Sequence, residues 1–182
     1  MKWKTLSSEY ISRHPYFTAR VDKCETEDGK IIPEYFVVEL PVSVGALALT
    51  EDNKAILVKQ YRHPINKELL EIPGGFIDEG EDPAKAVARE LLEETGYSFD
   101  SYEEVCIIAA NPGVLNNYTR FFLAKGGKKV SEQKLDFSED IEIVLMPLEE
   151  LTELLLQNKI EQSMHANCIF YALLKLGKIK VI

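Results

Sequence analysis

The sequence predicts an α/β protein in which helices cover a mixed β-sheet, preceded by a short antiparallel β-hairpin. The chain has 182 residues, of which 46% are hydrophobic and 28% charged, and this is enough for one domain with a substantial core. From residue 42 onward, β-rich runs are interspersed with segments of helical periodicity. The residues before this point are β-rich but too few for a core of their own. We therefore expect an N-terminal hairpin extension, residues 1–40, and a main domain, residues 41–182.

The elements can be placed in order along the chain. In the extension, Phe17–Val21 alternates apolar and polar residues, Asp28-Gly29 favours a hairpin turn, and Tyr35–Leu40 is a second β-rich run. The main domain is expected to contain strands at Val42–Leu49, Ala55–Gln60, Glu104–Ala110, Tyr118–Ala124 and Ile141–Met146, followed by helices at Pro147–Leu156 and Ser163–Leu176.

A further helix is expected in the middle of the chain. Asp82-Pro83 is typical of a helix start, because the Asp oxygen caps free N–H groups and Pro is tolerated in the first turn. Gly96 ends the helix after Thr95. The face expected to be buried consists of Ala84, Val87, Ala88, Leu91 and Leu92, which recur at helical spacing.

This helix concentrates negative charge. Glu90 and Glu94 are four residues apart and lie on one face, with Glu93 beside them. The three carboxylates repel one another, and the macrodipole near the helix C-terminus adds to the repulsion. A hard divalent cation relieves it, because Mg²⁺ prefers carboxylate oxygens. Just upstream, Gly74-Gly75 lets the backbone come close to a ligand.

Residues Gly75 to Tyr97 match the Nudix box, G-x5-E-x7-R-E-U-x-E-E-x-G-U, in which U is apolar. The chain therefore resembles the Nudix hydrolases. This resemblance implies an α/β/α sandwich and Mg²⁺-dependent hydrolysis of a nucleoside diphosphate linked to another group, with Mn²⁺ as a substitute metal. Carried over residue by residue, it implies metal ligation by Glu90, Glu94, Glu93 and the Gly74 carbonyl, orientation of the box acids by Arg89, and Glu81 as the acid at the helix start.

Motifs outside the box resemble those of ADP-ribose and nucleoside diphosphate-sugar pyrophosphatases. They are Gln60-Tyr61-Arg62, the sequence Glu71-Ile-Pro-Gly-Gly, and Pro112, which falls 15 positions after Tyr97. The fork geometry of a guanidinium suits a clamp on the diphosphate. Trp3 is expected to stack on a nucleobase, with a place in the core or at a frayed end as the alternative, and Asn116 is expected to hydrogen-bond the distal sugar. The expected substrate-binding residues are thus Arg62, Trp3, Gly75, Pro112 and Asn116.

The implied mechanism is in-line attack of water on one phosphorus, which needs a general base. In this branch the base often comes from an acidic loop late in the chain, here Asp136–Glu142. We place it at Glu139, with Glu93 as the alternative.

Composition limits the partners. A net charge of −9 argues against binding to nucleic acid or to an anionic membrane. Cys24, Cys106 and Cys168 match no zinc or disulfide framework. We find no signal peptide and no apolar stretch of about 18 residues, so a cytoplasmic protein is expected. The hairpin resembles the extension through which this branch dimerises, which implies a homodimer.

Two other functions stay open. A house-cleaning nucleoside triphosphate pyrophosphatase is disfavoured by Gln60-Tyr61-Arg62, by Pro112 and by the front hairpin. A non-catalytic, nucleotide-sensing Nudix domain usually lacks box acids, whereas this chain has all of them.

Overall fold

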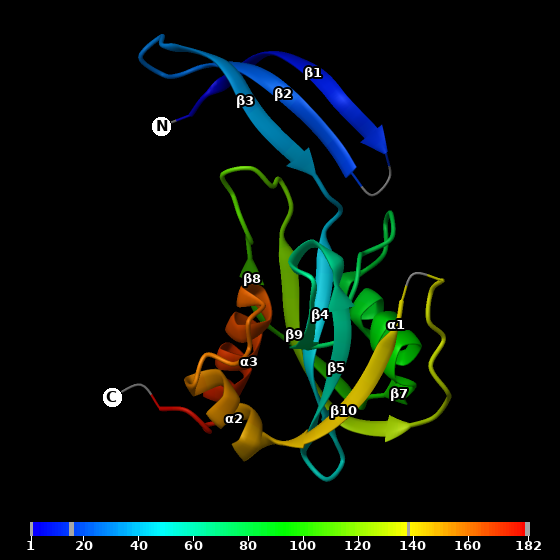
Figure 1. Ribbon diagram of the computed structural model, residues 1–182. Coiled ribbons are helices and arrows are strands. Elements are labelled where there is room, and N and C mark those ends of the chain that lie inside the picture. The colour runs from blue at the N-terminus through cyan, green and yellow to red at the C-terminus, as the bar shows by residue number, and fades with distance from the viewer. Residues whose placement is uncertain (1, 15–16, 138, 181–182) are drawn as a thin grey trace. The chain divides into compact units, whose positions relative to one another are not determined.

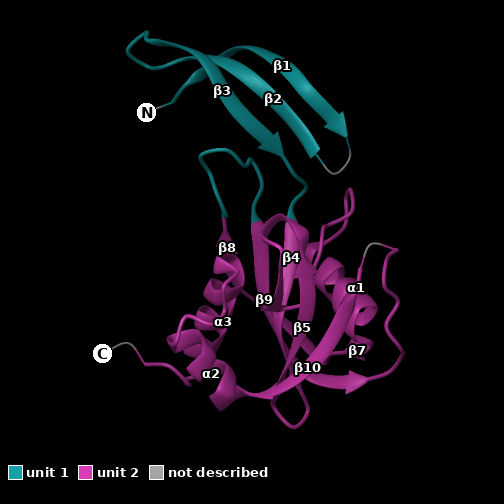
Figure 2. Cartoon of the chain, in the orientation of Figure 1, with its two compact units in different colours: residues 1–42, 109–118 teal, residues 43–108, 119–182 magenta. Residues whose placement is uncertain are grey.

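The computed structural model describes residues 2–14, 17–137 and 139–180. The chain separates into two compact units (Figure 2). Unit 1 consists of Met1–Val42 and Ala109–Tyr118, and unit 2 of Ser43–Ile108 and Thr119–Ile182.

Unit 1 contains a three-stranded antiparallel sheet in the order β1-β2-β3 (Figure 1). Its strands are β1 Lys4–His14, β2 Phe17–Glu25 and β3 Ile31–Glu39. The sequence predicted the β2–β3 hairpin but not β1. Register shifts between Thr5 and Ser7 and between Tyr10 and Ser12 explain this, because each shift breaks the two-residue alternation that identifies a strand.

The loop at 109–118 belongs to unit 1 through hydrogen bonds to the end of β3. The Val38 N–H donates to the Val114 carbonyl at 2.8 Å, and the Asn116 N–H donates to the Val38 carbonyl at 3.2 Å. The Leu40 N–H donates to Oδ1 of Asn116 at 3.1 Å. The extension is therefore joined by a loop that lies some 70 residues later in the sequence.

Unit 2 is built on a mixed sheet in the order β10-β5-β4-β9-β7, with β6 paired to β5 and β8 paired to β9 (Figure 1). The β4–β9 pair is parallel, and the other pairs in this sheet are antiparallel. The strands are β4 Ser43–Thr50, β5 Lys54–Arg62, β6 Lys67–Glu71, β7 Tyr97–Ser98, β8 Ser101–Ile108, β9 Thr119–Lys129 and β10 Ile141–Pro147, with a 3-10 turn at His63–Ile65.

Helices cover both faces of this sheet, as the α/β/α prediction requires (Figure 1). Helix α1, Pro83–Thr95, packs against the side chains of Ala46 and Ala48 of β4. Helices α2, Leu148–Leu156, and α3, Ser163–Lys175, lie in the core that contains Leu47 and Leu49 of the same strand. Because successive side chains of β4 point to opposite faces of the sheet, this one buried strand contributes to two cores, one on each face.

The expected boundaries need small changes. Strand β9 continues to Lys129, beyond its expected end at Ala124. Pro147 ends β10 and is the N-cap residue of α2 rather than its first residue. No α-helix within the described residues is long and apolar enough to span a membrane.

Candidate active site

Helix α1 begins and ends where its sequence predicts. Oδ1 of Asp82 accepts hydrogen bonds from the N–H groups of Ala84 and Lys85 at 3.1 and 3.2 Å. At the other end, Gly96 has a φ of 70° and donates its N–H to the Leu92 carbonyl at 2.8 Å. A residue with a side chain is strained at this φ, so glycine is the natural terminator.

The buried face of α1 differs from the expected one. Leu92 is 38% exposed and Ala84 is also exposed, so their assignment to the core was wrong. The residues actually buried are Ala86, Val87, Leu91, Glu94 and Thr95. Glu94 is therefore on the buried side of α1. Apolar periodicity alone did not predict this, because it assigns glutamates to the exposed side of a helix.

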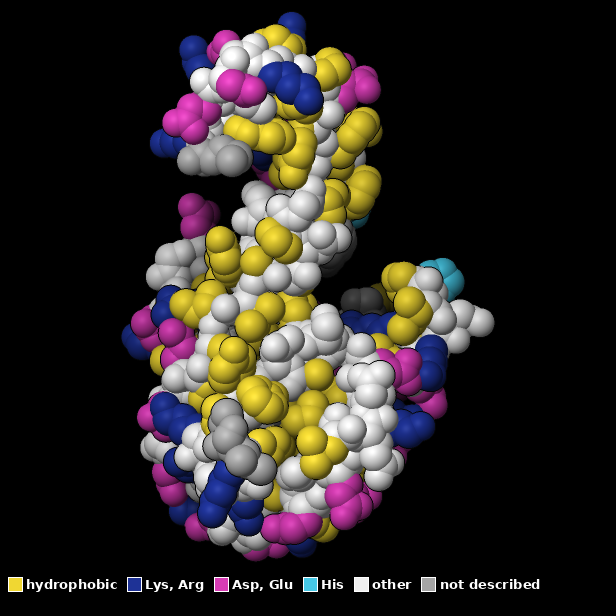
Figure 3. All heavy atoms as spheres, turned by 90° about the vertical axis from the view of Figure 1, so that its left-hand side faces the viewer, with side chains coloured by type: hydrophobic (Ala, Val, Ile, Leu, Met, Phe, Trp, Pro, Cys, Tyr) yellow, Lys and Arg dark blue, Asp and Glu magenta, His cyan; other side chains and the backbone are white. Residues whose placement is uncertain are grey.

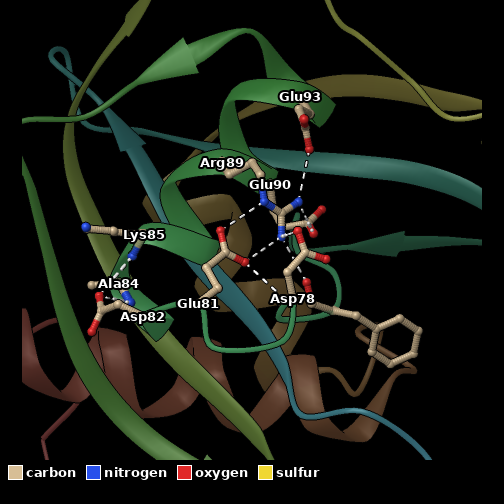
Figure 4. Close-up of polar contacts among 9 residues, drawn as sticks. Asp78, Glu81, Asp82, Ala84, Lys85, Arg89, Glu90 and Glu93 are labelled. Carbon is tan, nitrogen blue, oxygen red and sulfur yellow. Dashed lines mark hydrogen bonds and ion pairs between the residues drawn. The ribbon is translucent and has the colours of Figure 1, made fainter.

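Arg89 lies at the centre of the acidic residues of the box (Figure 4). Its Nε and Nη2 donate to the two carboxylate oxygens of Glu81 at 3.1 and 2.9 Å. Its Nη1 donates to Glu90 at 2.8 Å and to Glu93 at 3.1 Å. Its Nη2 also donates to the carbonyl of Phe76 at 3.1 Å. The bond to Arg89 holds the pKa of Glu81 below its usual range. One guanidinium therefore orders three carboxylates from two segments.

Glu94 differs from Glu81, Glu90 and Glu93, which accept the hydrogen bonds of Arg89. Its side chain is 6% exposed, and it accepts a hydrogen bond from the Gly74 N–H at 2.8 Å. Burial raises the pKa of Glu94 to about 8, and the charges of Glu90 and Glu139 act in the same direction. Burial also raises the pKa of Glu90, against the opposing effect of Arg89. Burial thus makes both groups costly to ionise, and Arg89 offsets part of this cost for Glu90.

Gly74 and Gly75 let the backbone after β6 lie close to β4 on one side and to the Glu90 carboxylate on the other. Gly74 has a φ of 155°, and a Cβ there would lie 2.2 Å from the carbonyl oxygen of Val44. A Cβ on Gly75 would lie 2.5 Å from Oε2 of Glu90. The Val44 N–H donates to the Gly75 carbonyl at 2.8 Å, which ties the glycines to β4. Backbone and carboxylates therefore meet with no space for a side chain between them.

The donor set fits a divalent metal ion. Glu90, Glu93 and Glu94 offer hard carboxylate oxygens from one helix, and buried Glu94 needs a positive partner. Within the described part of the chain, no three acidic, His or Cys side chains already form a metal-binding group. One oxygen each of Glu90 and Glu93 instead accepts a hydrogen bond from Arg89.

Among the loop acids, Glu139 has the clearest link to the box. Its charge raises the pKa of both Glu90 and Glu94, which means that it lies within electrostatic range of them. Its N–H donates to the Asp136 carbonyl, and its Oε2 accepts from the Asp136 N–H, both at 2.9 Å. Glu142 instead lies on β10, 4.0 Å from Nζ of Lys59.

Arg62 is paired with a residue that sequence reasoning did not assign. Its Nε donates to both carboxylate oxygens of Glu71 at 3.2 and 3.1 Å, and Glu71 is only 2% exposed. The Arg62 side chain stays 44% exposed, and its charge lowers the pKa of Glu94. The two motifs Gln-Tyr-Arg and Glu-Ile-Pro-Gly-Gly are thus joined by an ion pair, which their separation in sequence does not reveal.

The remaining predicted substrate residues lie in unit 1. The ring of Trp3 meets that of Tyr35 edge-on, with centroids 5.8 Å apart. The hydroxyl of Tyr35 donates to the Gly113 carbonyl at 3.0 Å, next to Pro112. Asn116 uses Oδ1 to accept from the backbone at 3.1 Å. Trp3, Pro112 and Asn116 therefore all belong to unit 1, whereas Arg62, Gly75 and the box acids lie in unit 2.

Comparison with known proteins agrees with this architecture. The family described as NUDIX domain matches residues 39–168, and the family described as nucleoside diphosphate sugar hydrolase N-terminal domain matches residues 3–38. A Bacillus methanolicus protein named methanol dehydrogenase activator is 33% identical over 161 residues, covering 88% of this chain and 86% of its own. The ADP-ribose pyrophosphatase of Bacillus subtilis (strain 168) is 31% identical over 173 residues, covering 94% and 93%.

A solved structure shows the same fold. The crystal structure of an ADP compounds hydrolase superimposes with a TM-score of 0.84 over 98% of both chains, at 22% sequence identity. The NUDIX match spans more than half of the chain and contains the whole carboxylate helix. The chain is therefore a member of the Nudix hydrolase family.

Proposed function

We propose that this protein hydrolyses the diphosphate bond of ADP-ribose or of another nucleoside diphosphate sugar, such as GDP-mannose. The products are a nucleoside monophosphate and a sugar phosphate. The observation that carries the reaction class is the buried Glu94 carboxylate beside Glu90, with Glu139 in electrostatic range. The substrate class is supported by the N-terminal match at residues 3–38 and by the names of relatives, which include ADP-ribose pyrophosphatase and ADP-sugar pyrophosphatase from Mus musculus.

The metal proposed for this site is Mg²⁺, with Mn²⁺ as a substitute. Glu90, Glu93, Glu94 and the Gly74 carbonyl would hold it. When bound, such an ion neutralises charge on the diphosphate and lowers the pKa of a water molecule. Binding also supplies the positive partner that the buried Glu94 carboxylate needs.

The protein's own groups divide the remaining work. Arg89 holds Glu90 and Glu93 in fixed orientations through its Nη1 group. Glu139 accepts the proton of the attacking water, with Glu93 as the alternative base. The proton goes to a carboxylate oxygen while the water oxygen forms a bond to phosphorus and the bridging oxygen leaves.

Arg62 binds the diphosphate in this proposal. Glu71 bonds its Nε and Nη2 edge, so the plane of the guanidinium is fixed before substrate arrives. Because the Arg62 side chain is 44% exposed, part of it is accessible to a ligand. A preorganised guanidinium suits an anionic ligand, since less rotational freedom is lost on binding.

Unit 1 is proposed to bind the nucleobase and distal sugar through Trp3, Pro112 and Asn116, and to form a homodimer. A three-stranded sheet has a small core, and apolar side chains are exposed on this one (Figure 3). They include Trp3, Leu6, Tyr10, Ile11, Phe17 and Phe36, which are between 37% and 61% exposed. A second copy of the chain is the commonest partner for such a surface.

One screen tests the proposal. Purified protein is incubated with Mg²⁺ or with a chelator, against ADP-ribose, GDP-mannose, other nucleotide sugars and nucleoside triphosphates, and the products are identified. We expect metal-dependent release of a nucleoside monophosphate and a sugar phosphate. Release of pyrophosphate from triphosphates alone would instead identify a house-cleaning enzyme. Binding of nucleotides without turnover would identify a sensing domain.

A further inference from the structure

The segment that leads into the acidic loop is bonded to the C-terminal end of helix α1. The Val130 N–H donates to the Gly96 carbonyl at 2.9 Å, and the Lys134 N–H donates to the Glu93 carbonyl at 2.8 Å. Between them, Nε2 of Gln133 donates to the Glu94 carbonyl at 2.7 Å. The last carbonyls of a helix have no partner inside the helix. This segment therefore provides donors at the end of the helix that carries the box acids.

Gln133 makes a second bond that distinguishes it from its neighbours. Its Nε2 also donates to the Ile141 carbonyl at 3.2 Å, at the first residue of β10. Gln133 precedes the acidic loop, Asp136–Glu142, and Ile141 lies near the end of that loop. A single amide nitrogen thus joins the segment before the loop, the start of β10 and the carboxylate helix.

The loop also has internal order. Asp136 and Glu139 exchange two hydrogen bonds of 2.9 Å, one between backbone groups and one to the Glu139 carboxylate. These bonds tie Glu139 to Asp136, which lies three residues after Gln133.

Gln133 bonds the same helix that carries the box acids. Its Nε2 donates to the carbonyl of Glu94 itself. The Glu139 carboxylate lies within electrostatic range of Glu90 and Glu94. The anchor of the segment and the acids that Glu139 faces therefore belong to one element.

We propose that Gln133 is a positioning residue, whose side-chain amide ties the start of β10 to the C-terminal end of α1 and so keeps Glu139 within electrostatic range of Glu90 and Glu94. This inference rests on the proposed function, in which Glu139 is the general base. Glutamine suits the task because one NH₂ group offers two donors. A glutamate has the same length, but its carboxylate would meet two carbonyl oxygens and repel them.

The test is a double-mutant cycle on steady-state turnover with ADP-ribose and saturating Mg²⁺. Gln133→Met keeps the length of the side chain but removes both donors. We expect it to lower kcat about tenfold, with KM changed less than about twofold, because a displaced base acts mainly on the transition state. Glu139→Gln alone should lower kcat by about a hundredfold. The control is Gln157→Met, at an exposed position after α2, which should leave kcat unchanged.

The informative result is the double variant. If Gln133 acts through Glu139, Gln133→Met should have no further effect on kcat once Glu139 has been replaced. Multiplicative losses would overturn the inference, because they would mean that Gln133 acts by another route. A wild-type kcat for Gln133→Met, or for Glu139→Gln, would also overturn it.

A second measurement needs no turnover and so separates this inference from the proposed function. In the metal-free protein, backbone amides of residues 130–141 should exchange with solvent faster in Gln133→Met, while those of α3 stay unchanged. Unchanged exchange in 130–141 would overturn the inference whatever the substrate. Absence of any nucleotide hydrolysis by the wild-type protein, with the exchange result as expected, would instead refute the proposed function and with it the role of Glu139 as base.

Discussion

Replacing Glu94 by Gln should make the metal-free protein more stable while removing its activity. The glutamate is buried, and its carboxylate accepts a hydrogen bond from the Gly74 N–H at 2.8 Å. Glutamine has almost the same shape and retains an oxygen for this bond. It lacks the negative charge that a metal ion needs. The two effects of the substitution therefore have opposite signs.

The size of the stabilisation follows from linkage. In the unfolded chain Glu94 ionises near pH 4.5, whereas burial raises its pKa to about 8 in the folded protein. Between these values the folded state binds the proton more tightly, so the wild type loses stability as the pH rises. At about 1.4 kcal/mol per pKa unit, the loss is about 2 kcal/mol at pH 6 and about 5 kcal/mol at pH 9. Glutamine does not titrate and avoids this loss.

The assay is urea unfolding in a metal chelator at pH 6 and pH 9, followed by the helical circular dichroism signal. This signal reports on unit 2, because the α-helices of the described residues lie there. We expect Glu94→Gln to exceed the wild type in free energy of unfolding, with a larger gap at pH 9. Glu150→Gln, at an exposed position on α2, is the control and should show no gap.

Two further measurements complete the test. Mg²⁺ should stabilise the wild type and not Glu94→Gln, because binding to the folded state alone raises the free energy of unfolding. The variant should lose about a hundredfold or more in kcat, the scale seen when a central charge-stabilising contact is removed. A variant that is less stable than the wild type at pH 9 in chelator would refute the electrostatic reasoning. Near-wild-type kcat with saturating Mg²⁺ would refute the assignment of Glu94 as a metal ligand.

Three other predictions follow from individual contacts. Gly75→Ala should fold, because its Cβ would meet the end of a side chain rather than backbone, Oε2 of Glu90 at 2.5 Å. Displacing this carboxylate from its bond with Arg89 should raise the Mg²⁺ concentration for half-maximal activity about tenfold or more; an unchanged Mg²⁺ titration would contradict the close approach. Burial lowers the pKa of His165 from 6.5 to about 4, so the wild type should lose up to about 3 kcal/mol of stability as pH falls through this range. The His165→Leu variant should not show this loss of stability. If the free energy of unfolding in urea falls equally with pH in both proteins, the prediction is wrong. Deleting residues 1–40 should convert a dimer to a monomer in light scattering and raise KM for the nucleotide sugar; a full-length monomer at micromolar concentration, or an unchanged KM, would defeat the proposed role of unit 1.

The sequence by itself determined the features that depend on near neighbours. The cap at Asp82, the end of α1 at Gly96 and the spacing of Glu90 and Glu94 all follow from residues within a few positions of one another. A helix places such residues by its own geometry, whatever surrounds it. For the same reason the box motif was sufficient to indicate the family, and the α/β/α arrangement came with it.

The tertiary structure decided what depends on distant partners. Strand β1 is hard to recognise because two register shifts interrupt its alternation, and only pairing with β2 identifies it. The inward position of Glu94 is settled by the packing of α1 on the sheet and by the Gly74 N–H, which apolar periodicity does not report. The Arg62–Glu71 pair joins residues that are not opposite each other in the β5–β6 ladder, where Glu71 lies opposite Val58, so the strand register does not predict it either. Gln133 stands in a loop without a pattern, and its amide acquires a role only because folding brings the end of α1 and the start of β10 within hydrogen-bonding distance of it.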